Sequence, residues 1–143
     1  YEIGVRLVGS EMCIRDRELG IPTLVWMTPI LPFINDTREN IEGLLDYCLQ
    51  AGVQGILLFD VGVTLRDGDR EFFYQALDRD FPGIRQKYVH TYGNAYDIPS
   101  PHAKELMALI RNTCSANSIL CSPKECFACL NEFPERYVQQ TLF

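Results

Sequence analysis

Two short apolar segments of the sequence each run into residues with ligand-binding chemistry. Residues 23–27 and residues 55–59 are bulky and uncharged, which is typical of strands buried on both faces. In folds built from strand–loop–helix repeats, ligands bind at the loops that follow the strands. The candidate binding residues in these two loops are Pro29, Asn35, Asp36, Asp60, Gly62 and Thr64.

Some polar residues also have a purely structural interpretation. Asp36 directly precedes an expected helix, and we favour a capping role for it over a ligand role. Asp60 ends an apolar segment, where an ionisable group is either functional or paired, and both interpretations stay open. His90 and His102 lack a matching set of metal ligands in the sequence, which favours surface or packing roles.

Four cysteines in the last third of the chain also have two interpretations. Cys121, Cys126 and Cys129 have a spacing that suits zinc or an auxiliary cluster, with Cys114 upstream. Cys126 and Cys129 are also three residues apart on an expected short helix, where cysteine serves as a small apolar residue. We favour packing over metal binding.

The first half of the sequence predicts a strand, a helix and a second strand. Asp36 or Thr37 caps the expected helix, with Glu39 in capping-box position, and Gly52 ends it. Short joints between these elements predict a right-handed parallel βαβ unit. The apolar stripe that faces the sheet is Ile41, Leu44, Leu45, Cys48 and Leu49.

The second half predicts further helices joined by loops. Residues 60–65 and 95–99 are expected as loops, and residues 70–78 and 84–92 as helices. A helix capped by Ser100 then follows, and a short one begins at Ser122. The residues expected to be buried on these helices are Phe72, Phe73, Leu77, Leu106, Leu109 and Ile110. The last short helix contains Phe127 and Leu130.

Composition limits the function classes. The 143 residues suffice for one core and carry a net charge of -6, which gives no electrostatic support for binding nucleic acid or anionic membranes. No apolar run approaches the length of a membrane span. Six cysteines without a secretory pattern indicate reduced thiols or metal ligands in a cytoplasmic protein, and not a disulfide scaffold.

Residues 1–17 have neither a helical nor a strand period. This string resembles translated sequencing-adapter sequence, so we expect it to be a non-native artefact. A native N-terminal strand or arm is the weaker alternative.

From residue 20 to residue 143, the order of motifs resembles one protein family. The chain resembles the C-terminal half of a radical S-adenosylmethionine protein of the spore-photoproduct-lyase-like family, often labelled DNA repair photolyase. The segments that carry the resemblance are GIPT at 20–23, PILPFINDT at 29–37, GVTLRDG at 62–68, REFFY at 70–74, Tyr88, YGN at 92–94, Phe133 and QQTLF at 139–143.

The resemblance implies an α/β fold, namely the last two parallel strands and helices of a partial (βα) TIM-like barrel. Residues 18–93 would form this part of the barrel, and residues 94–143 a C-terminal helical extension and tail. We expect helices on one side of the two strands and an exposed apolar edge where further strands belong. The six candidate residues would then line the barrel mouth and contact the cofactor.

The resemblance also implies S-adenosylmethionine and a four-iron four-sulfur cluster as cofactors of the full-length parent enzyme. The family's CxxxCxxC loop, which holds the cluster, is absent from this sequence. We therefore expect this chain to hold neither cofactor alone and to be inactive without the rest of the enzyme.

Two partners are further expectations. The family label suggests a DNA substrate for the parent enzyme. Gln139, Leu142 and Phe143 resemble a motif that docks on the bacterial sliding clamp, and a tail folded back on its own helices is the favoured alternative. A non-radical barrel lyase and a non-catalytic adaptor acting through this tail are the competing functions.

Overall fold

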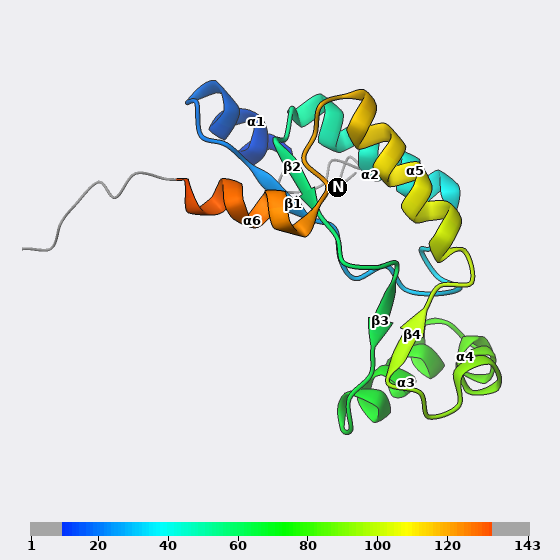
Figure 1. The fold of residues 1–143 in the computed structure, drawn as a ribbon. Helices are drawn as coiled ribbons and strands as arrows, with labels where there is room; N and C mark the ends of the chain where they lie inside the picture. Colours follow the sequence, from blue (N-terminus) through cyan, green and yellow to red (C-terminus); the bar gives the residue numbers. More distant parts are fainter. Residues whose placement is uncertain (1–9, 133–143) are drawn as a thin grey trace, which may run out of the picture.

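The computed structural model describes residues 10–132 of the chain, which form helices and short strands (Figure 1). The described part is mixed α/β, with six helices, two small sheets and no closed barrel. The elements in chain order are α1 (Ser10–Glu18), β1 (Leu24–Trp26), α2 (Arg38–Ala51), β2 (Gly55–Leu57), β3 (Gly62–Thr64), α3 (Asp69–Asp80), α4 (Ile84–Tyr92), β4 (Asp97–Pro99), α5 (Ala103–Ala116) and α6 (Pro123–Asn131).

The first sheet pairs β1 with β2 in parallel, which confirms the predicted parallel connection through α2. Leu120 adds a parallel bridge on the far side of β2, where Ile56 N–H donates to Leu120 C=O at 2.7 Å. The chain therefore repeats one pattern, because α2 joins β1 to β2 and α5 leads back to the bridge at Leu120. Helices α2 and α5 contact each other, and α6 contacts β2 (Figure 1).

Helix α2 forms where the sequence predicted it. The Thr37 hydroxyl accepts a hydrogen bond from Asn40 N–H at 3.2 Å, and Gly52 ends the helix with a left-handed φ of 65°. Ile41, Leu45 and Cys48 of its apolar stripe enter the main core and Leu44 packs against it, as predicted. The fifth member of the stripe, Leu49, is only half-buried and lies outside this core. The buried residues of that core are Met27, Ile30, Ile41, Leu45, Cys48, Ala51, Val53, Ile56, Leu58, Val61, Leu106, Ile110 and Cys114.

The prediction that the first strand is buried on both faces is wrong. Val25 packs against the main core, whereas the side chain of Trp26 is 58% exposed. Alternation along a strand sends neighbouring side chains to opposite faces, and the face of β1 that carries Trp26 is only partly covered. A run of apolar residues does not reveal this, because both faces have the same residue types.

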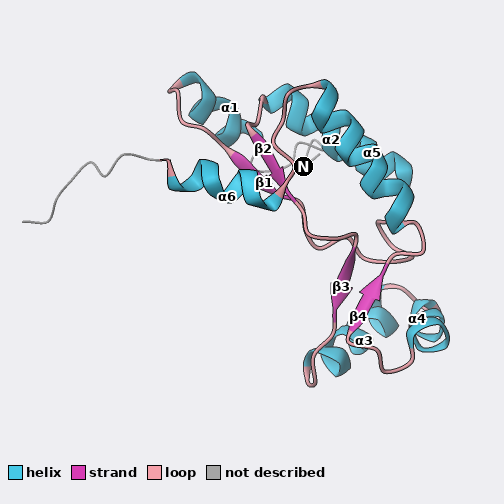
Figure 2. Cartoon of the chain, viewed as in Figure 1, coloured by secondary structure: helices cyan, strands magenta, loops and turns pink. Residues whose placement is uncertain are grey.

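A second lobe is inserted between β2 and α5, as Figure 2 shows. It consists of β3 and β4 in an antiparallel pair, with helices α3 and α4 between them. We predicted loops at both strands, which was wrong. Each strand has three residues, and these include the glycine and proline that normally indicate loops.

Gly62 explains why such short strands pair. A Cβ atom at this position would lie 2.5 Å from the carbonyl oxygen of Ile98 and 2.9 Å from the Cα of Pro99. The absence of a side chain therefore allows β4 to approach β3.

Tyr88 is the centre of the second lobe's core and is fully buried. Its ring has edge-to-face contacts with Phe33, Phe73 and Tyr74 at centroid distances between 5.3 and 6.5 Å. On α3, Leu77 is buried as predicted, but Phe72 is 76% exposed, so that part of the prediction is wrong. Tyr74 takes the inward position because it precedes Leu77 by three residues, which places both side chains on one face of the helix.

Helices α5 and α6 begin near their predicted starts. Leu106 and Ile110 are buried on α5, and Leu109 packs partly buried against the main core. On α6, Cys126 and Cys129 are buried, whereas Phe127 and Leu130 are 42% and 45% exposed. The small cysteines therefore occupy the inward face of α6.

Residues 10–18, for which we predicted no helix, form α1, which contacts α2. Within the described residues, no helix is long and apolar enough to cross a membrane.

Candidate functional site

A cleft of about 550 Å³ lies at the carboxyl ends of β1 and β2, between these ends and the β3–β4 pair. We call it the mouth cleft. Four of the six candidate residues, Pro29, Asp60, Gly62 and Thr64, line it. The complete lining is Trp26, Thr28, Pro29, Phe59, Asp60, Gly62, Val63, Thr64, Asp97, Ile98 and Pro99.

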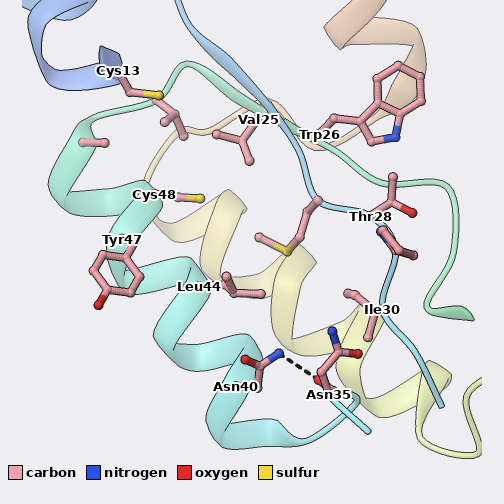
Figure 3. Close-up of a pocket in the computed structure, with 14 residues that line it drawn as sticks. Cys13, Val25, Trp26, Thr28, Ile30, Asn35, Asn40, Leu44, Tyr47 and Cys48 are labelled. Atoms are coloured by element: carbon pink, nitrogen blue, oxygen red, sulfur yellow. Dashed lines mark hydrogen bonds between the residues drawn. The ribbon is translucent and has the colours of Figure 1, made fainter. Parts of the chain in front are cut away.

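Two aromatic rings form the apolar side of the mouth cleft. Trp26 at the end of β1 and Phe59 after β2 have ring centroids 6.0 Å apart with an interplanar angle of 57°. Both are largely exposed, at 58% and 60%. Figure 3 shows Trp26 and Val25 on opposite sides of β1, so Trp26 points away from the main core. The pair is available to stack on a ligand.

Two carboxylates and two hydroxyls form the polar side. Asp60 accepts a hydrogen bond from Val61 N–H at 2.7 Å through Oδ1, which holds the carboxylate next to the end of β2. Asp97 is the register partner of Thr64 across the β3–β4 pair. Asp60, Asp97, Thr28 and Thr64 are all exposed, and none of the lining residues is basic.

Thr64 also touches a tyrosine beside the cleft. Hydrogen bonds from Arg66 and then Thr64, together with the positive charge of Arg66, lower the pKa of the Tyr96 phenol. The Arg66 guanidinium is thereby engaged by Tyr96, outside the cleft lining.

Asn35 faces a different, mainly apolar pocket of about 440 Å³ between β1 and α2 (Figure 3). Its side-chain oxygen accepts from Leu31 N–H, and its backbone carbonyl accepts from the Asn40 side chain at 2.8 Å. The side-chain oxygen of Asn35 therefore has its partner in the loop after β1, and its backbone oxygen has a partner in the first turn of α2. Asn35 shapes this loop and does not line the mouth cleft.

Asp36 does not cap α2, because Thr37 does. Asp36 is 4% exposed and accepts a hydrogen bond from the Ser100 hydroxyl. Our capping interpretation was therefore wrong for Asp36, and its carboxylate instead ties the loop after β1 to the start of α5. The Ser100 hydroxyl also accepts from His102 N–H at 3.0 Å. The second histidine, His90, is exposed on α4.

The second lobe holds the loop after β1 in place. The Tyr88 hydroxyl donates to the Pro32 carbonyl at 2.7 Å, and Phe33 packs on Tyr88 and Tyr92. Phe33 has a φ of 63°, a conformation that bulky residues adopt only when their surroundings enforce it. Burial, with the nearby Tyr92 and Asp36, raises the pKa of Tyr88 well above its usual value.

The cysteines lie inside the main lobe, away from the mouth cleft. The Cys126 thiol lies 3.8 Å from the Ile56 and Leu120 carbonyl oxygens, and burial raises its pKa. Burial and a hydrogen bond with Cys121 raise the pKa of Cys114 to about 12. Within the described residues, no group of three or more His, Cys, Asp or Glu side chains is placed to hold a metal ion.

Sequence reasoning missed Trp26, Phe59, Thr28 and Asp97 as parts of one site. Trp26 and Phe59 were assigned to strand interiors, and Asp97 to a loop remote from both strands. The only signal for Asp97 was its place before Ile98 and Pro99, which gives no information about pairing with Gly62 and its neighbours.

Three mycobacterial proteins are similar to this chain, each 30% identical over 91 residues. They are named Uncharacterized protein Rv2578c and Uncharacterized protein MT2655, from two strains of Mycobacterium tuberculosis, and Uncharacterized protein Mb2609c, from Mycobacterium bovis. The alignments cover 64% of this chain and 26% of each relative, so the chain spans about a quarter of their length. No protein-family model matches the chain, and no solved structure matches it.

Proposed function

We propose that this chain is the C-terminal part of a radical S-adenosylmethionine enzyme of the spore-photoproduct-lyase-like family. In that role, the mouth cleft forms part of the surface that faces cofactor and substrate. The observation that carries the proposal is the position of the cleft at the carboxyl ends of two parallel strands, where barrel enzymes bind their ligands.

The repeated strand–helix pattern supports the barrel part of the proposal. Helices α2 and α5 share one core on one face of β1 and β2, which matches the outer helix layer of a (βα) barrel. Trp26 is on the other face, where its register partner Leu57 is buried and α6 contacts β2. In the proposed barrel, the part of this face around Trp26 would be the interior. Further strands of the enzyme would pair with the outer edge of β1, because β2 occupies its other edge.

In this family, S-adenosylmethionine supplies a 5′-deoxyadenosyl radical that abstracts hydrogen from the substrate. Trp26 and Phe59 would stack on planar groups at the mouth, and Asp60 and Thr64 would accept hydrogen bonds from hydroxyl or amino groups. This chain's residues do not fit the iron–sulfur cluster, because its cysteines lack the CxxxCxxC spacing.

The partners and the location remain part of the proposal. We place the parent enzyme in the cytoplasm, where its thiols stay reduced. A DNA substrate comes only from the family label, and the acidic mouth cleft gives it no support. Gln139, Leu142 and Phe143, the expected sliding-clamp motif, lie outside the described residues.

The test uses the longer coding sequence that contains residues 18–143. After anaerobic reconstitution with iron and sulfide, we expect reductant-dependent formation of 5′-deoxyadenosine from S-adenosylmethionine. The Asp60→Asn variant should form it more slowly, whereas Asp46→Asn, on the exposed side of α2, should match the wild type. An upstream sequence without a CxxxCxxC segment, or no 5′-deoxyadenosine from the reconstituted protein, would refute the proposal.

A further inference from the structure

We propose that the mouth cleft recognises a guanidinium group, as in an arginine side chain. This inference deepens the proposed function and rests on it only in treating the cleft as a substrate-facing surface. The evidence is the combination of an exposed aromatic pair with two carboxylates in one cleft of about 550 Å³, a volume typical of small-ligand sites.

The aromatic pair is the first part of the argument. Large aromatic residues normally bury most of their surface, yet Trp26 and Phe59 are 58% and 60% exposed while touching each other. Their rings come from the ends of two different strands and meet at one side of the cleft. Such faces attract cations through the ring quadrupole, most strongly at tryptophan.

The charges of the lining are the second part. Asp60 and Asp97 come from separate elements, the loop after β2 and strand β4. Within the described part of the chain, neither carboxylate has an ion-pair partner, and no lining residue carries a positive charge. The cleft lining therefore carries negative charge only, and the nearby Arg66 guanidinium lies outside the lining, on Tyr96. An acidic lining repels phosphates and attracts cations.

A guanidinium suits this lining better than a primary ammonium. It is planar and weakly hydrated, so it can stack on Trp26 while its N–H groups pair with a carboxylate at two points. The hydroxyl oxygens of Thr28 and Thr64 are additional acceptors at the cleft. A primary ammonium is a compact and strongly hydrated charge that cannot stack in this way.

The chain contains its own probe for this interaction, because Trp26 is its single tryptophan. We would titrate the full chain with N-acetyl-arginine methylamide and follow Trp26 fluorescence. The matched neutral ligand is N-acetyl-citrulline methylamide, which replaces the guanidinium by a urea of the same shape. We expect saturable quenching by the arginine derivative and binding of the citrulline derivative that is weaker by about tenfold or more.

Two further arms identify the source of the guanidinium. Binding of free arginine as tight as that of the blocked derivative would indicate a small-molecule ligand. Tighter binding of the blocked derivative would indicate an arginine residue within a polypeptide. Either result supports guanidinium recognition. Adenosine has no guanidinium group, and if it bound as tightly as the two arginine ligands, the proposal would be overturned.

The decisive variant combines Asp60→Asn with Asp97→Asn. Asparagine keeps an oxygen that can accept from Val61 N–H, so the local hydrogen bond of Asp60 is retained. We expect affinity for the arginine derivative to fall by about tenfold or more, with an unchanged circular dichroism spectrum. The control is Asp46→Asn combined with Asp67→Asn, which removes two exposed carboxylates outside the cleft.

Equal affinity for the arginine and citrulline derivatives, or wild-type affinity in the cleft variant, would overturn the proposal. So would an absence of quenching by the arginine derivative at millimolar concentration. These results are independent of the iron–sulfur chemistry. Guanidinium binding without 5′-deoxyadenosine formation would refute only the proposed function, and the reverse pattern would refute only this inference.

Discussion

Individual side chains of this protein have roles that depend on their partners more than on their type. Asp36 and Thr37 are adjacent and both suit a helix cap, but only the Thr37 hydroxyl accepts a hydrogen bond from a backbone N–H of α2. Asp36 turns inward to Ser100, which lies 64 residues further along the chain. Sequence spacing alone cannot distinguish the two, because the deciding contact is a long-range one.

Tyr88 provides a test of how the second lobe stabilises the loop after β1, next to the mouth cleft. Tyr88→Phe removes the buried hydroxyl that donates to Pro32 C=O at 2.7 Å and leaves that carbonyl without its partner. We expect a loss of about 1–2 kcal/mol in the free energy of unfolding, measured by urea denaturation. Tyr92→Phe is the control, because the Tyr92 hydroxyl bonds to Pro99 C=O in an exposed setting where water can replace it. Equal losses in the two variants would contradict this role.

The buried thiols predict a loss of stability in alkaline solution. Burial raises the pKa of Cys48 from 9.0 to about 11, and that of Cys114 to about 12. The unfolded thiols release their protons near pH 9, whereas the folded ones do not. Their contribution to the free energy of unfolding is therefore complete below pH 9. It is then lost as the pH rises towards the folded pKa values.

Above pH 9, each of these thiols should lower the free energy of unfolding by up to about 1.4 kcal/mol per pH unit. Urea unfolding under reducing conditions between pH 8 and 10.5 measures this slope. Cys48→Ala and Cys114→Ala should each flatten it, even though each variant is less stable at pH 8. An unchanged slope in both variants would show that other groups cause the decline.

At the scale of elements, the sequence predicted the long helices well and the short strands poorly. Helix α4 has its predicted bounds, and α2 starts and stops at the residues whose chemistry indicated this. These elements depend on local caps and on a period that many residues repeat. Strands β3 and β4 have three residues each and exist because of mutual pairing, for which the sequence gives no local signal.

The candidate site was also predictable only in part. The loops after β1 and β2 were correctly placed at one end of the parallel pair, since parallel strands share their carboxyl edge. Asp97 and the exposure of Trp26 could not be predicted, because both depend on how β4 and the two strand ends meet in space.

Gly62 tests the close approach of β3 and β4. Gly62→Ala would place a Cβ atom 2.5 Å from the Ile98 carbonyl oxygen, so the pair must separate. We expect destabilisation of about 1–3 kcal/mol, comparable with overpacking of a core. Gly43→Ala is the control, since Gly43 lies within α2 with open space around its Cα. It should stabilise the chain by about 0.5–1 kcal/mol. Thermal unfolding of the two variants should therefore shift in opposite directions.

At the scale of the whole molecule, the two lobes have different tasks. The main lobe supplies the parallel strands, and the second lobe, inserted between β2 and α5, supplies the opposite wall of the mouth cleft. Arg70 joins the two ends of the inserted lobe's helical part, because its guanidinium donates to the carbonyls of Leu65, Gly93, Asn94 and Ala95 at 2.7 to 3.3 Å. These hydrogen bonds hold the residue after β3 next to the residues before β4, and so fix the strand pair that lines one side of the mouth cleft.

The exposure of Trp26 leads to a prediction that tests the proposed barrel. In this chain, the indole is 58% exposed on the strand face opposite α2, so acrylamide should quench its fluorescence efficiently and its emission should be red-shifted. If further strands complete a barrel around this face, Trp26 will lie in the barrel interior of the longer protein. We expect a blue shift there and a quenching constant lower by about half or more, as burial excludes the quencher. The Trp26→Phe variant of the longer protein identifies and subtracts the emission of any other tryptophan. Equal quenching of Trp26 in both proteins would show that this face stays open to solvent, and the barrel arrangement would then be wrong.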